Sequence, residues 1–331
     1  MRVLVSGGAG YVGSFAVRSL SSAGHEVLVI DDLSTGRREA VGRVPMVVAD
    51  IRDEAAMDRA FSGFRPHAVM HFAGLKSSEE SMTEIGRYLD VNVRGLTTIL
   101  ECSRRHGVGR FILSSSCSVY GTPDSAPVTE ESAVAPQSPY GESKAIGERL
   151  VQWYGRLTDM RFANLRYFNA AGAAVDGSHG AFVAPSVREI FPMVIRASLG
   201  LVDGIRIMGN DFPTPDGTAV RDYIHVEDLA DAHLRVLEGL DTADTSGSYN
   251  IGCGTGVSVR EVVHAVRSVS GRRPPVAVGP KRPGDPAGLW ADTTRMRKVF
   301  GWEARHNLLK IAETAWRWHQ ENPTTLGFPA G

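Results

Sequence analysis

The chain lacks the features of a secreted, metal-binding or membrane-spanning protein. Its 331 residues contain three cysteines, an odd number without Cys-x-x-Cys spacing, which indicates a reducing compartment rather than a disulfide scaffold or a zinc site. Its ten histidines form no His-Glu-x-x-His pattern, so we expect no metal. An apolar run at residues 2–6 meets glycines at once, which argues against a signal peptide or a membrane span there. We therefore expect a cytoplasmic protein with no membrane partner.

The chain also lacks an excess of charge of either sign. Its net charge of −1 gives no reason to expect nucleic acid as a partner, so any bound anion must be held by locally placed groups. With 43% hydrophobic and 22% charged residues, the composition is that of a globular protein. The length allows two domains, or one large sheet domain with an appended lobe.

The first 31 residues have the pattern of a dinucleotide-binding unit. Residues 2–6 and 26–30 are short β-branched runs typical of buried parallel strands, and a helical pattern lies between them. The turn from Gly7 to Gly13 contains the glycines that a tight turn, a bound pyrophosphate and close helix–strand packing require. Asp31 can accept hydrogen bonds from ribose hydroxyls and would repel a 2′-phosphate, so the pattern predicts NAD rather than NADP.

Strands and helices continue to alternate as far as residue 170, which predicts an α/β fold with a doubly wound parallel sheet. The expected elements are strands at 45–48, 68–72, 110–114 and 161–168, and helices at 87–106 and 140–157. Beyond residue 170, glycine and proline are scattered and the expected strands are short, residues 248–251 among them. We therefore expect a Rossmann-type NAD-binding domain at residues 1–170. A smaller mixed α/β lobe is expected at residues 171–331, with the ligand site between the two.

The stretch Ser138-Pro-Tyr-Gly-Glu-Ser-Lys144 reads as the start of a helix, with serine as N-cap and proline at the first helical position. Tyr140 and Lys144 are four residues apart and share one helical face. An ammonium beside a phenol lowers the phenol pKa, and a drop of about 3 units corresponds to roughly 4 kcal/mol. An exposed ion pair supplies less than that, so a cofactor cation would have to help. The alternative is an ordinary surface tyrosine and lysine.

Several motifs occur together in one order along the chain. They are Gly7-Gly-Ala-Gly-Tyr-Val-Gly-Ser14, Phe72-Ala-Gly-Leu-Lys76, Ser114-Ser-Ser116, Tyr140-x-x-x-Lys144, Arg166-Tyr-Phe-Asn169, Gly209-Asn-Asp-Phe-Pro-Thr214, Asp216-Gly-Thr-Ala-Val-Arg-Asp-Tyr-Ile-His225, Asn250-Ile-Gly and Arg282-Pro-Gly-Asp285. In these motifs the chain resembles the extended short-chain dehydrogenase/reductase superfamily and, within it, the UDP-glucose 4-epimerases. The resemblance covers essentially the whole chain.

The resemblance implies a tightly held NAD and a reversible inversion at C4 of a UDP-hexose, most simply UDP-glucose and UDP-galactose, through a 4-keto sugar. Tyr140 would take the C4 hydroxyl proton, and Ser116 would bind the same hydroxyl and relay the proton. Lys144 would hold the nicotinamide ribose and lower the tyrosine pKa. The positively charged nicotinamide ring would be the second cation that lowers this pKa.

The resemblance also implies two sets of binding residues. Expected at the cofactor are Gly7, Gly10, Tyr11, Val12, Gly13, Asp31, Asp32, Leu33, Ser34, Thr35, Gly36, Asp50, Ile51, Phe72, Ala73, Gly74, Leu75, Lys76, Asn92, Ser116, Tyr140, Lys144 and Phe168. Expected at the UDP-sugar are Ser116, Tyr140, Asn169, Arg188, Arg221, Arg282, Asp285 and Leu289. The alternatives are that Phe72 and Phe168 belong to the core, that Asn92 caps or bridges a strand, and that the arginines form surface ion pairs.

Three positions depart from the epimerase pattern. Arg188-Glu189 stands where an asparagine pair is usual. Because a diphosphate would repel a carboxylate, we expect Glu189 to point elsewhere. Arg188 would then contact the phosphate, or reach a carboxylate or another unusual group on the sugar. Leu289 replaces a tyrosine or cysteine beside the hexose, which leaves UDP-N-acetylglucosamine open, and Ser78 replaces a frequent valine.

Other readings of the motifs are a sugar-nucleotide 4,6-dehydratase, an NAD-sensing regulator without catalysis, or a C4 epimerase of UDP-glucuronate or a specialised sugar. A dehydratase of this kind needs an Asp-Glu pair after the serine strand, and residues 116–120 contain no carboxylate. A regulator would not need Tyr140, Lys144 and the UDP-matching arginines. The resemblance also implies a homodimer, formed through the helices at 93–106 and 141–157.

Overall fold

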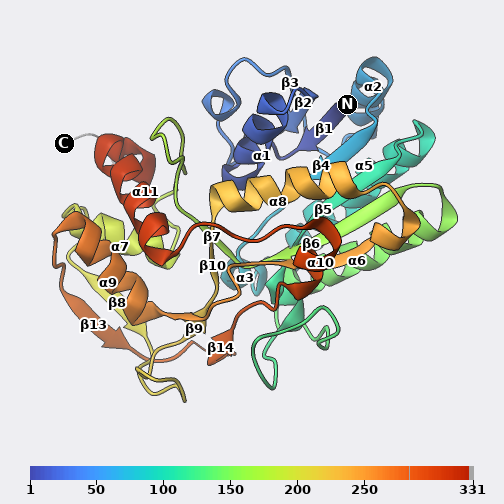
Figure 1. The fold of residues 1–331 in the computed structure, drawn as a ribbon. Helices are drawn as coiled ribbons and strands as arrows, with labels where there is room; N and C mark the ends of the chain where they lie inside the picture. Colours follow the sequence, from blue (N-terminus) through green and yellow to red (C-terminus); the bar gives the residue numbers. More distant parts are fainter. Residues whose placement is uncertain (283, 328–331) are drawn as a thin grey trace.

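The computed structural model describes residues 1–282 and 284–327 of the chain (Figure 1). Its main sheet has seven parallel strands in the order β11-β6-β5-β4-β1-β2-β3. The strands are β1 (Arg2–Ser6), β2 (Glu26–Asp31), β3 (Met46–Val48), β4 (Ala68–His71), β5 (Arg110–Ser116), β6 (Arg161–Tyr167) and β11 (Gly247–Ile251). The predicted doubly wound α/β fold is confirmed.

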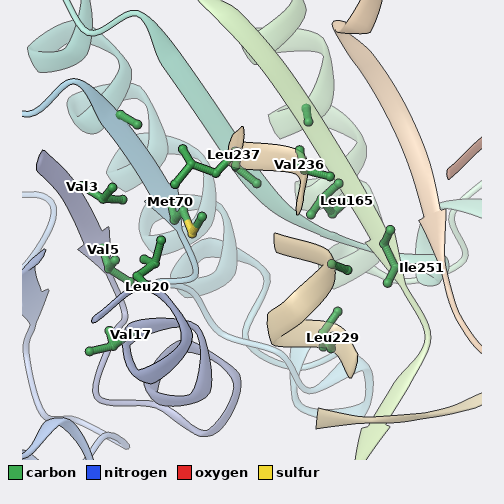
Figure 2. Close-up of a cluster of buried hydrophobic side chains, with 14 of the residues drawn as sticks. Val3, Val5, Val17, Leu20, Met70, Leu165, Leu229, Val236, Leu237 and Ile251 are labelled. Carbon is green, nitrogen blue, oxygen red and sulfur yellow. The ribbon is translucent and has the colours of Figure 1, made fainter. Parts of the chain in front are cut away.

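Two layers of helices cover the sheet. On one face lie α1 (Tyr11–Ser22) and α8 (Val226–Gly239), and on the other α2 (Glu54–Phe64), α5 (Gly95–Arg105) and α6 (Pro139–Leu157). Figure 2 shows the first layer, where Leu20 of α1 and Val236 of α8 lie around Val5, Met70 and Leu165 of the strands. Because alternate strand residues face opposite layers, both faces are buried, as the short β-branched runs predicted.

The sequence-based division at residue 170 misplaced two elements. It assigned α8 and β11 to the second lobe, whereas α8 covers the main sheet and β11 pairs with β6 along Gly247–Ile251. Met296 and Trp302 also join the core under this face of the sheet. A strand takes its place from its hydrogen-bonding partner rather than from its position along the chain, so the boundary could not be read from local pattern.

The second lobe is a mixed α/β unit, as expected, with its own core under α7, α9 and α11. Its elements are β7 (Asn169–Ala171), α7 (Ile190–Ser198), β8 (Ile205–Met208), β9 (Val220–Arg221), β10 (Tyr223–His225), β12 (Val257–Ser258), α9 (Val259–Ser270), β13 (Val276–Gly279), β14 (Gly288–Leu289) and α11 (Leu308–Glu321). The strands form small sheets, in the orders β10-β7, β12-β9-β14 and β13-β8. Pro283 of the Arg282–Asp285 motif and residues 328–331 of the expected lobe lie outside the described residues.

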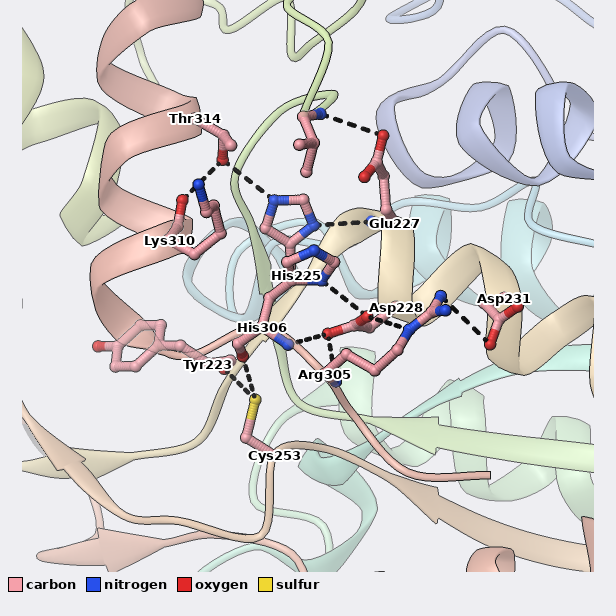
Figure 3. A network of polar contacts seen from close by, with 11 residues as sticks. Tyr223, His225, Glu227, Asp228, Asp231, Cys253, Arg305, His306, Lys310 and Thr314 are labelled. Atoms are coloured by element: carbon pink, nitrogen blue, oxygen red, sulfur yellow. Dashed lines mark hydrogen bonds and ion pairs between the residues drawn. The ribbon is translucent and has the colours of Figure 1, made fainter. Parts of the chain in front are cut away.

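A buried polar network joins the sheet domain to the second lobe (Figure 3). Asp228 of α8 is fully buried, accepts the backbone N–H groups of Arg305 and His306, and lies 2.8 Å from Nδ1 of His306. The His306 ring lies 4.3 Å from that of His225, whose Nε2 lies 3.1 Å from Oγ1 of Thr314 on α11. These contacts fix the segment that leads into α11 against α8.

The predicted helix at 87–106 is three consecutive pieces, α4 (Ile85–Leu89), a π-helical turn η2 (Asp90–Arg94) and α5. The remaining short elements are α3 (Ser78–Ser81), α10 (Thr294–Phe300) and the 3₁₀ turns η1 (Arg38–Val41), η3 (Cys117–Tyr120), η4 (Ala243–Thr245) and η5 (Pro323–Leu326). No helix in the described part of the chain is both long and apolar enough to cross a membrane.

Candidate active site

The helix α6 places Tyr140 and Lys144 at the carboxyl end of the main sheet. As predicted, the Ser138 side chain caps this helix by accepting the Gly141 N–H at 3.1 Å, and Pro139 is its first residue. Tyr140 and Lys144 are only 9% and 8% exposed, and Lys144 Nζ lies 6.0 Å from the centre of the Tyr140 ring. Lys144 Nζ also donates to the Ser114 carbonyl at 2.8 Å. This burial excludes the reading of an ordinary surface tyrosine and lysine.

Three consecutive serines at the end of β5 each have a separate contact. Ser114 accepts Lys144 through its carbonyl, and the Ser115 hydroxyl donates to Glu148 Oε1 at 2.5 Å. Ser116 caps the turn η3, where its Oγ accepts the Ser118 N–H at 3.2 Å. Its hydrogen bond to Tyr140 works to lower the tyrosine pKa. The predicted triad of Tyr140, Lys144 and Ser116 therefore meets at one point in the fold.

Burial shifts the pKa values of Tyr140 and Lys144 in opposite directions. Burial raises the pKa of Tyr140 to about 12, against the hydrogen bond from Ser116, and the charges of Cys117 and Glu189 raise it further. Burial lowers the pKa of Lys144 to about 8, against the attraction of Glu148. Desolvation therefore outweighs the lowering effect of the protein's own groups on the pKa of Tyr140. That Lys144 lowers this pKa together with a bound cofactor cation stays a prediction.

The turn after β1 is a cradle that only glycine can form. A Cβ on Gly13 would lie 2.2 Å from the Gly7 carbonyl oxygen. Gly7 itself has a φ of +74°, and a Cβ on it would lie 2.4 Å from the Ala73 nitrogen. The first turn of α1, which contains Tyr11 and Val12, thus stands directly over the end of β1. This arrangement fits a pyrophosphate at the helix N-terminus.

At the end of β2, Asp31 is held with its carboxylate ready to accept further hydrogen bonds. Its two oxygens accept the N–H groups of Ala9 and Leu33, both at 2.9 Å. Burial raises its pKa, and these two hydrogen bonds oppose that rise. A Cβ on Gly36 would lie 2.8 Å from Asp31 Oδ1, so the backbone passes close to this carboxylate. Next to it is a small pocket whose lining includes Ala9, Gly10, Tyr11, Thr35, Arg37 and Phe182.

The π-helical turn η2 brings Asn92 to the end of β4. Asn92 Oδ1 accepts the Leu75 N–H at 2.8 Å, and Nδ2 donates to the Leu75 carbonyl at 3.0 Å and to the Ser143 hydroxyl at 2.9 Å. Asn92 therefore bridges the loop after β4 to α6. A Cβ on Gly74 would lie 2.9 Å from Asn92 Oδ1 and 3.8 Å from Lys144 Nζ, so Gly74 leaves space beside the lysine.

Other expected cofactor residues lie around this edge of the sheet. Asp50 is paired with Arg52, whose hydrogen bonds hold the pKa of Asp50 below its usual range. Ile51 is buried, Phe72 lies 4.8 Å from the His233 ring, and Phe168 is buried in a cluster with Val119 and Leu289. For these last side chains, packing in the core is sufficient to explain the burial.

The expected UDP-sugar residues of the second lobe lie in and around the small sheet of β9. Arg221 forms an ion pair with Asp285, and Arg282 is exposed. Leu289 of β14 pairs in register with Arg221 of β9. Its side chain is buried in a cluster against which Cys117, the residue after Ser116, packs. The Asn169 side chain donates to the Asp222 carbonyl at 2.9 Å.

Residues 3–252 match the model of the NAD dependent epimerase/dehydratase family. The chain is 40% identical to a UDP-glucose 4-epimerase of Lacticaseibacillus casei, over 99% of both chains. Among solved structures, it is similar to UDP-glucose-4-epimerase from Stenotrophomonas maltophila with bound NAD and formylated UDP-arabinopyranose, with a TM-score of 0.94, 36% identity and 98% and 99% coverage of the two chains. A UDP-glucose 4-epimerase from Bifidobacterium longum in complex with NAD+ and UDP gives a TM-score of 0.91 and 34% identity, with 98% and 100% coverage.

The chain belongs to the NAD dependent epimerase/dehydratase family. The resemblance to the UDP-glucose 4-epimerases, first seen in the motifs, is confirmed along the whole chain by these relatives. The assignment of individual site residues stays a prediction, supported by the positions described above.

The structure places Glu189 against a cation of the sheet domain. Its carboxylate lies 2.8 Å from Lys76 Nζ, and its charge raises the pKa of Tyr140. That Glu189 points away from a bound diphosphate stays a prediction. Arg188 is exposed, and its charge acts on Arg196.

A buried ion pair that the sequence pattern did not predict lies behind the triad. Arg166 of β6 binds Glu148 of α6 through Nε at 2.9 and 3.1 Å and a terminal nitrogen at 2.6 Å. Both side chains are buried, and Glu148 also accepts the Ser115 hydroxyl. The spacing of Lys144 and Glu148 places a carboxylate one helical turn from the lysine. It does not identify Arg166 as the partner of Glu148, because Arg166 lies on another element, 18 residues along the chain.

Proposed function

We propose that this protein is an NAD-dependent UDP-hexose 4-epimerase, with UDP-glucose and UDP-galactose as its pair of substrates. The observation that carries the proposal is the meeting of Tyr140, Ser116 and Lys144 beside the glycine cradle, at the carboxyl edge of the sheet. Full-length similarity to UDP-glucose 4-epimerases supports the same reaction. The dehydratase reading is not favoured, because no carboxylate follows the serine strand in residues 116–120.

The residues at the sheet edge fit NAD along its whole length. The cradle of Gly7, Gly10 and Gly13 would hold the pyrophosphate, and Asp31 with residues 32–36 would hold the adenosine ribose. Lys144 and the space left by Gly74 would receive the nicotinamide ribose. Bound there, NAD would supply reversible hydride transfer at C4 of the sugar, by way of a 4-keto sugar.

Tyr140 and Ser116 would bind the C4 hydroxyl of the sugar and transfer its proton. Tyr140 Oη would take the proton of the C4 hydroxyl and later return it, and Ser116, which lowers the pKa of Tyr140, would bind the same hydroxyl. The phenol pKa of about 12 makes Tyr140 a poor base in the free protein. A positive ring bound nearby would lower that pKa, so the proton is taken only when the cofactor is oxidised and in place.

The second lobe would hold the UDP group. Arg221 and Arg282 suit the diphosphate because a guanidinium pairs with phosphate oxygens through two parallel hydrogen bonds. Asn169 and Asp285 would fix polar groups of the nucleotide. Since Arg221 and Asp285 are paired with each other in the free protein, UDP binding exchanges this ion pair for contacts with the ligand.

The epimerase would act as a cytoplasmic homodimer. Trp153 and Leu157 on α6 are 56% and 76% exposed, which is unusual for large apolar side chains on a soluble domain. The α5 and α6 helices are joined by the Tyr154–Glu101 hydrogen bond, and so present one continuous surface. Pairing of this surface with its copy would cover both apolar side chains.

The direct test is to incubate the purified protein with UDP-glucose, UDP-N-acetylglucosamine and UDP-glucuronate, and to separate each from its C4 epimer by chromatography. We expect conversion of UDP-glucose to UDP-galactose and back. Conversion of UDP-N-acetylglucosamine alone would move the proposal to an N-acetylhexosamine epimerase, which Leu289, intermediate in bulk between the usual tyrosine and cysteine, leaves open. Conversion of none of the three would contradict the proposal.

A further inference from the structure

The small pocket beside the glycine turn is lined by both lobes. The sheet domain supplies the start of α1 and the loop after β2, and the second lobe supplies a segment that precedes α7. Their residues at this pocket include Gly10, Tyr11, Thr35, Arg37, Gly180 and Phe182. Because the start of α1 fits a pyrophosphate, the pocket lies at the phosphate end of the expected NAD site.

The segment of the second lobe is docked on α1 before it reaches this pocket. Oγ of Ser14 lies 2.8 Å from Nε2 of His179, and both side chains are buried. The Tyr11 hydroxyl donates to the Gly172 carbonyl at 2.7 Å. These contacts hold the chain that leads to Phe182 against the first turns of α1.

Phe182 and Arg37 face each other across the pocket. The guanidinium carbon of Arg37 lies 6.0 Å from the centre of the Phe182 ring. The same ring lies edge-on to Trp318, whose Nε1 donates to the Ala181 carbonyl at 3.0 Å. At the other end, the Arg37 N–H donates to the Ala9 carbonyl at 3.0 Å. The backbone of Arg37 is therefore fixed beside the glycine turn, and its guanidinium lies near a ring that the second lobe holds.

The charge of Arg37 is available to a ligand. Arg37 is exposed, and within the described part of the chain no carboxylate forms an ion pair with it. Contact with an aromatic ring uses none of the N–H donors of a guanidinium as hydrogen bonds. Those donors can therefore pair with phosphate oxygens while Phe182 holds the side chain.

We propose that Arg37 is a cofactor-binding residue whose guanidinium pairs with the pyrophosphate of the dinucleotide, and that Phe182 of the second lobe is its positioning residue. The inference rests on the part of the proposed function that places NAD in the glycine cradle. The second lobe then helps to retain NAD, because the cofactor cannot leave until Arg37 releases a phosphate.

The test measures the release of NAD, so that it does not depend on turnover. Protein loaded with NAD is mixed with an excess of isotopically labelled NAD, and the bound label is followed over time after rapid gel filtration. Arg37→Gln should release NAD roughly tenfold faster than the wild type, since it loses a charged hydrogen-bond donor to phosphate. Added salt should accelerate release in the wild type and do so less in the variant, because salt screens the pairing.

The matched control is Arg38→Gln, the same change at the next residue. Arg38 is also exposed, but its terminal nitrogen donates to the Val44 carbonyl at 3.4 Å, before β3. This variant should keep the release rate and the salt dependence of the wild type. Release that is unchanged in Arg37→Gln, or equally faster in both variants, would overturn the inference and leave the epimerase proposal intact. A protein that binds no NAD would overturn both.

A second variant tests the positioning role of Phe182. Phe182→Ala should release NAD about two- to fivefold faster, the scale of an exposed contact between a cation and a ring. Because Phe182 acts through Arg37, the double variant should release NAD no faster than Arg37→Gln alone. Effects that multiply in the double variant would show that Phe182 retains the cofactor independently of Arg37, against the positioning role.

Discussion

The two sides of the proposed cleft are built in different ways. On the sheet side, Tyr140, Lys144 and Ser116 are buried, and Lys144 is held by the Ser114 carbonyl at 2.8 Å. On the side of the second lobe, Arg282 is exposed and Arg221 is bound to Asp285, a neighbour that is itself expected at the ligand. The side chains of the sheet domain are therefore in place before a ligand binds. In the second lobe, Arg221 must release Asp285 before it can contact a ligand.

This difference matches the demands of the proposed reaction. A proton-transferring group must lie within about 0.5 Å of its productive position, so rigid neighbours that are already in place favour catalysis. A nucleotide is bound and released in every cycle, and an ion pair that reforms when UDP leaves offsets part of the cost of exposing a charged site.

The largest effect is expected at the proton-transferring phenol. Tyr140→Phe should lower kcat by roughly 10²–10⁴-fold, because it removes a general base without altering the ring packing. Steady-state assays with UDP-galactose measure the loss. Tyr154→Phe, on the same helix but bonded to Glu101, is the control and should keep its activity. Equal activity in the two variants would remove the catalytic role of Tyr140.

On the sheet side, the position of α6 should depend on the buried ion pair between Glu148 and Arg166. Glu148→Gln leaves the charge of Arg166 buried and uncompensated, and should lower the free energy of unfolding by about 3–5 kcal/mol. Denaturant unfolding measures this change. Glu142→Gln, which breaks the exposed pair with Arg149, is the comparison on the same helix and should cost no more than about 1 kcal/mol. Similar values for both would mean that the buried pair does not hold α6 to the sheet.

On the side of the second lobe, a substitution should change the affinity for UDP rather than the free energy of unfolding. Arg221→Lys keeps the charge that pairs with Asp285 but loses the planar fork, and should weaken UDP binding by roughly 10- to 100-fold. Calorimetric titration with UDP tests this, with the exposed Arg297→Lys as control. An unchanged affinity would indicate that Arg221 is a structural ion-pair partner and not a ligand contact.

The smallest expected effect concerns acid stability of the second lobe. Burial, with the charge of Arg196, lowers the pKa of His319 to about 3, below the ordinary value of about 6.5. Between these values the unfolded chain binds a proton that the folded protein does not, so the free energy of unfolding falls as pH falls below about 6.5. From pH 7 to 5 this one group accounts for about 2 kcal/mol of that fall.

His319→Gln should therefore reduce the loss of stability between pH 7 and 5 by about 2 kcal/mol relative to the wild type. Denaturant unfolding at the two pH values provides the comparison, which is independent of any uniform destabilisation by the variant. Replacing the exposed His264 with glutamine should leave the loss unchanged. The same loss in His319→Gln as in wild type would contradict the assignment of a neutral, buried histidine.

Much of the first half of the fold could be predicted from local sequence alone. The strand of residues 2–6 and the cap of α6 at Ser138 lie where the pattern placed them. Glycine spacing and helix capping act between neighbouring residues, so their consequences are visible in the chain. The π-helical turn at Asn92 was not visible, because its cause is the set of hydrogen bonds that this side chain makes with Leu75 and Ser143, far away in sequence.

By itself the sequence determined the reaction class and the residues to examine, because the motifs along the whole chain resemble those of the UDP-glucose 4-epimerases. Only the tertiary structure decided the charge environment of those residues. It placed β11 in the main sheet, buried Tyr140 deeply enough to raise its pKa, and brought Glu189 to Lys76 across 113 residues. Desolvation and charge pairing depend on distances through space, and the order of residues along the chain does not contain those distances.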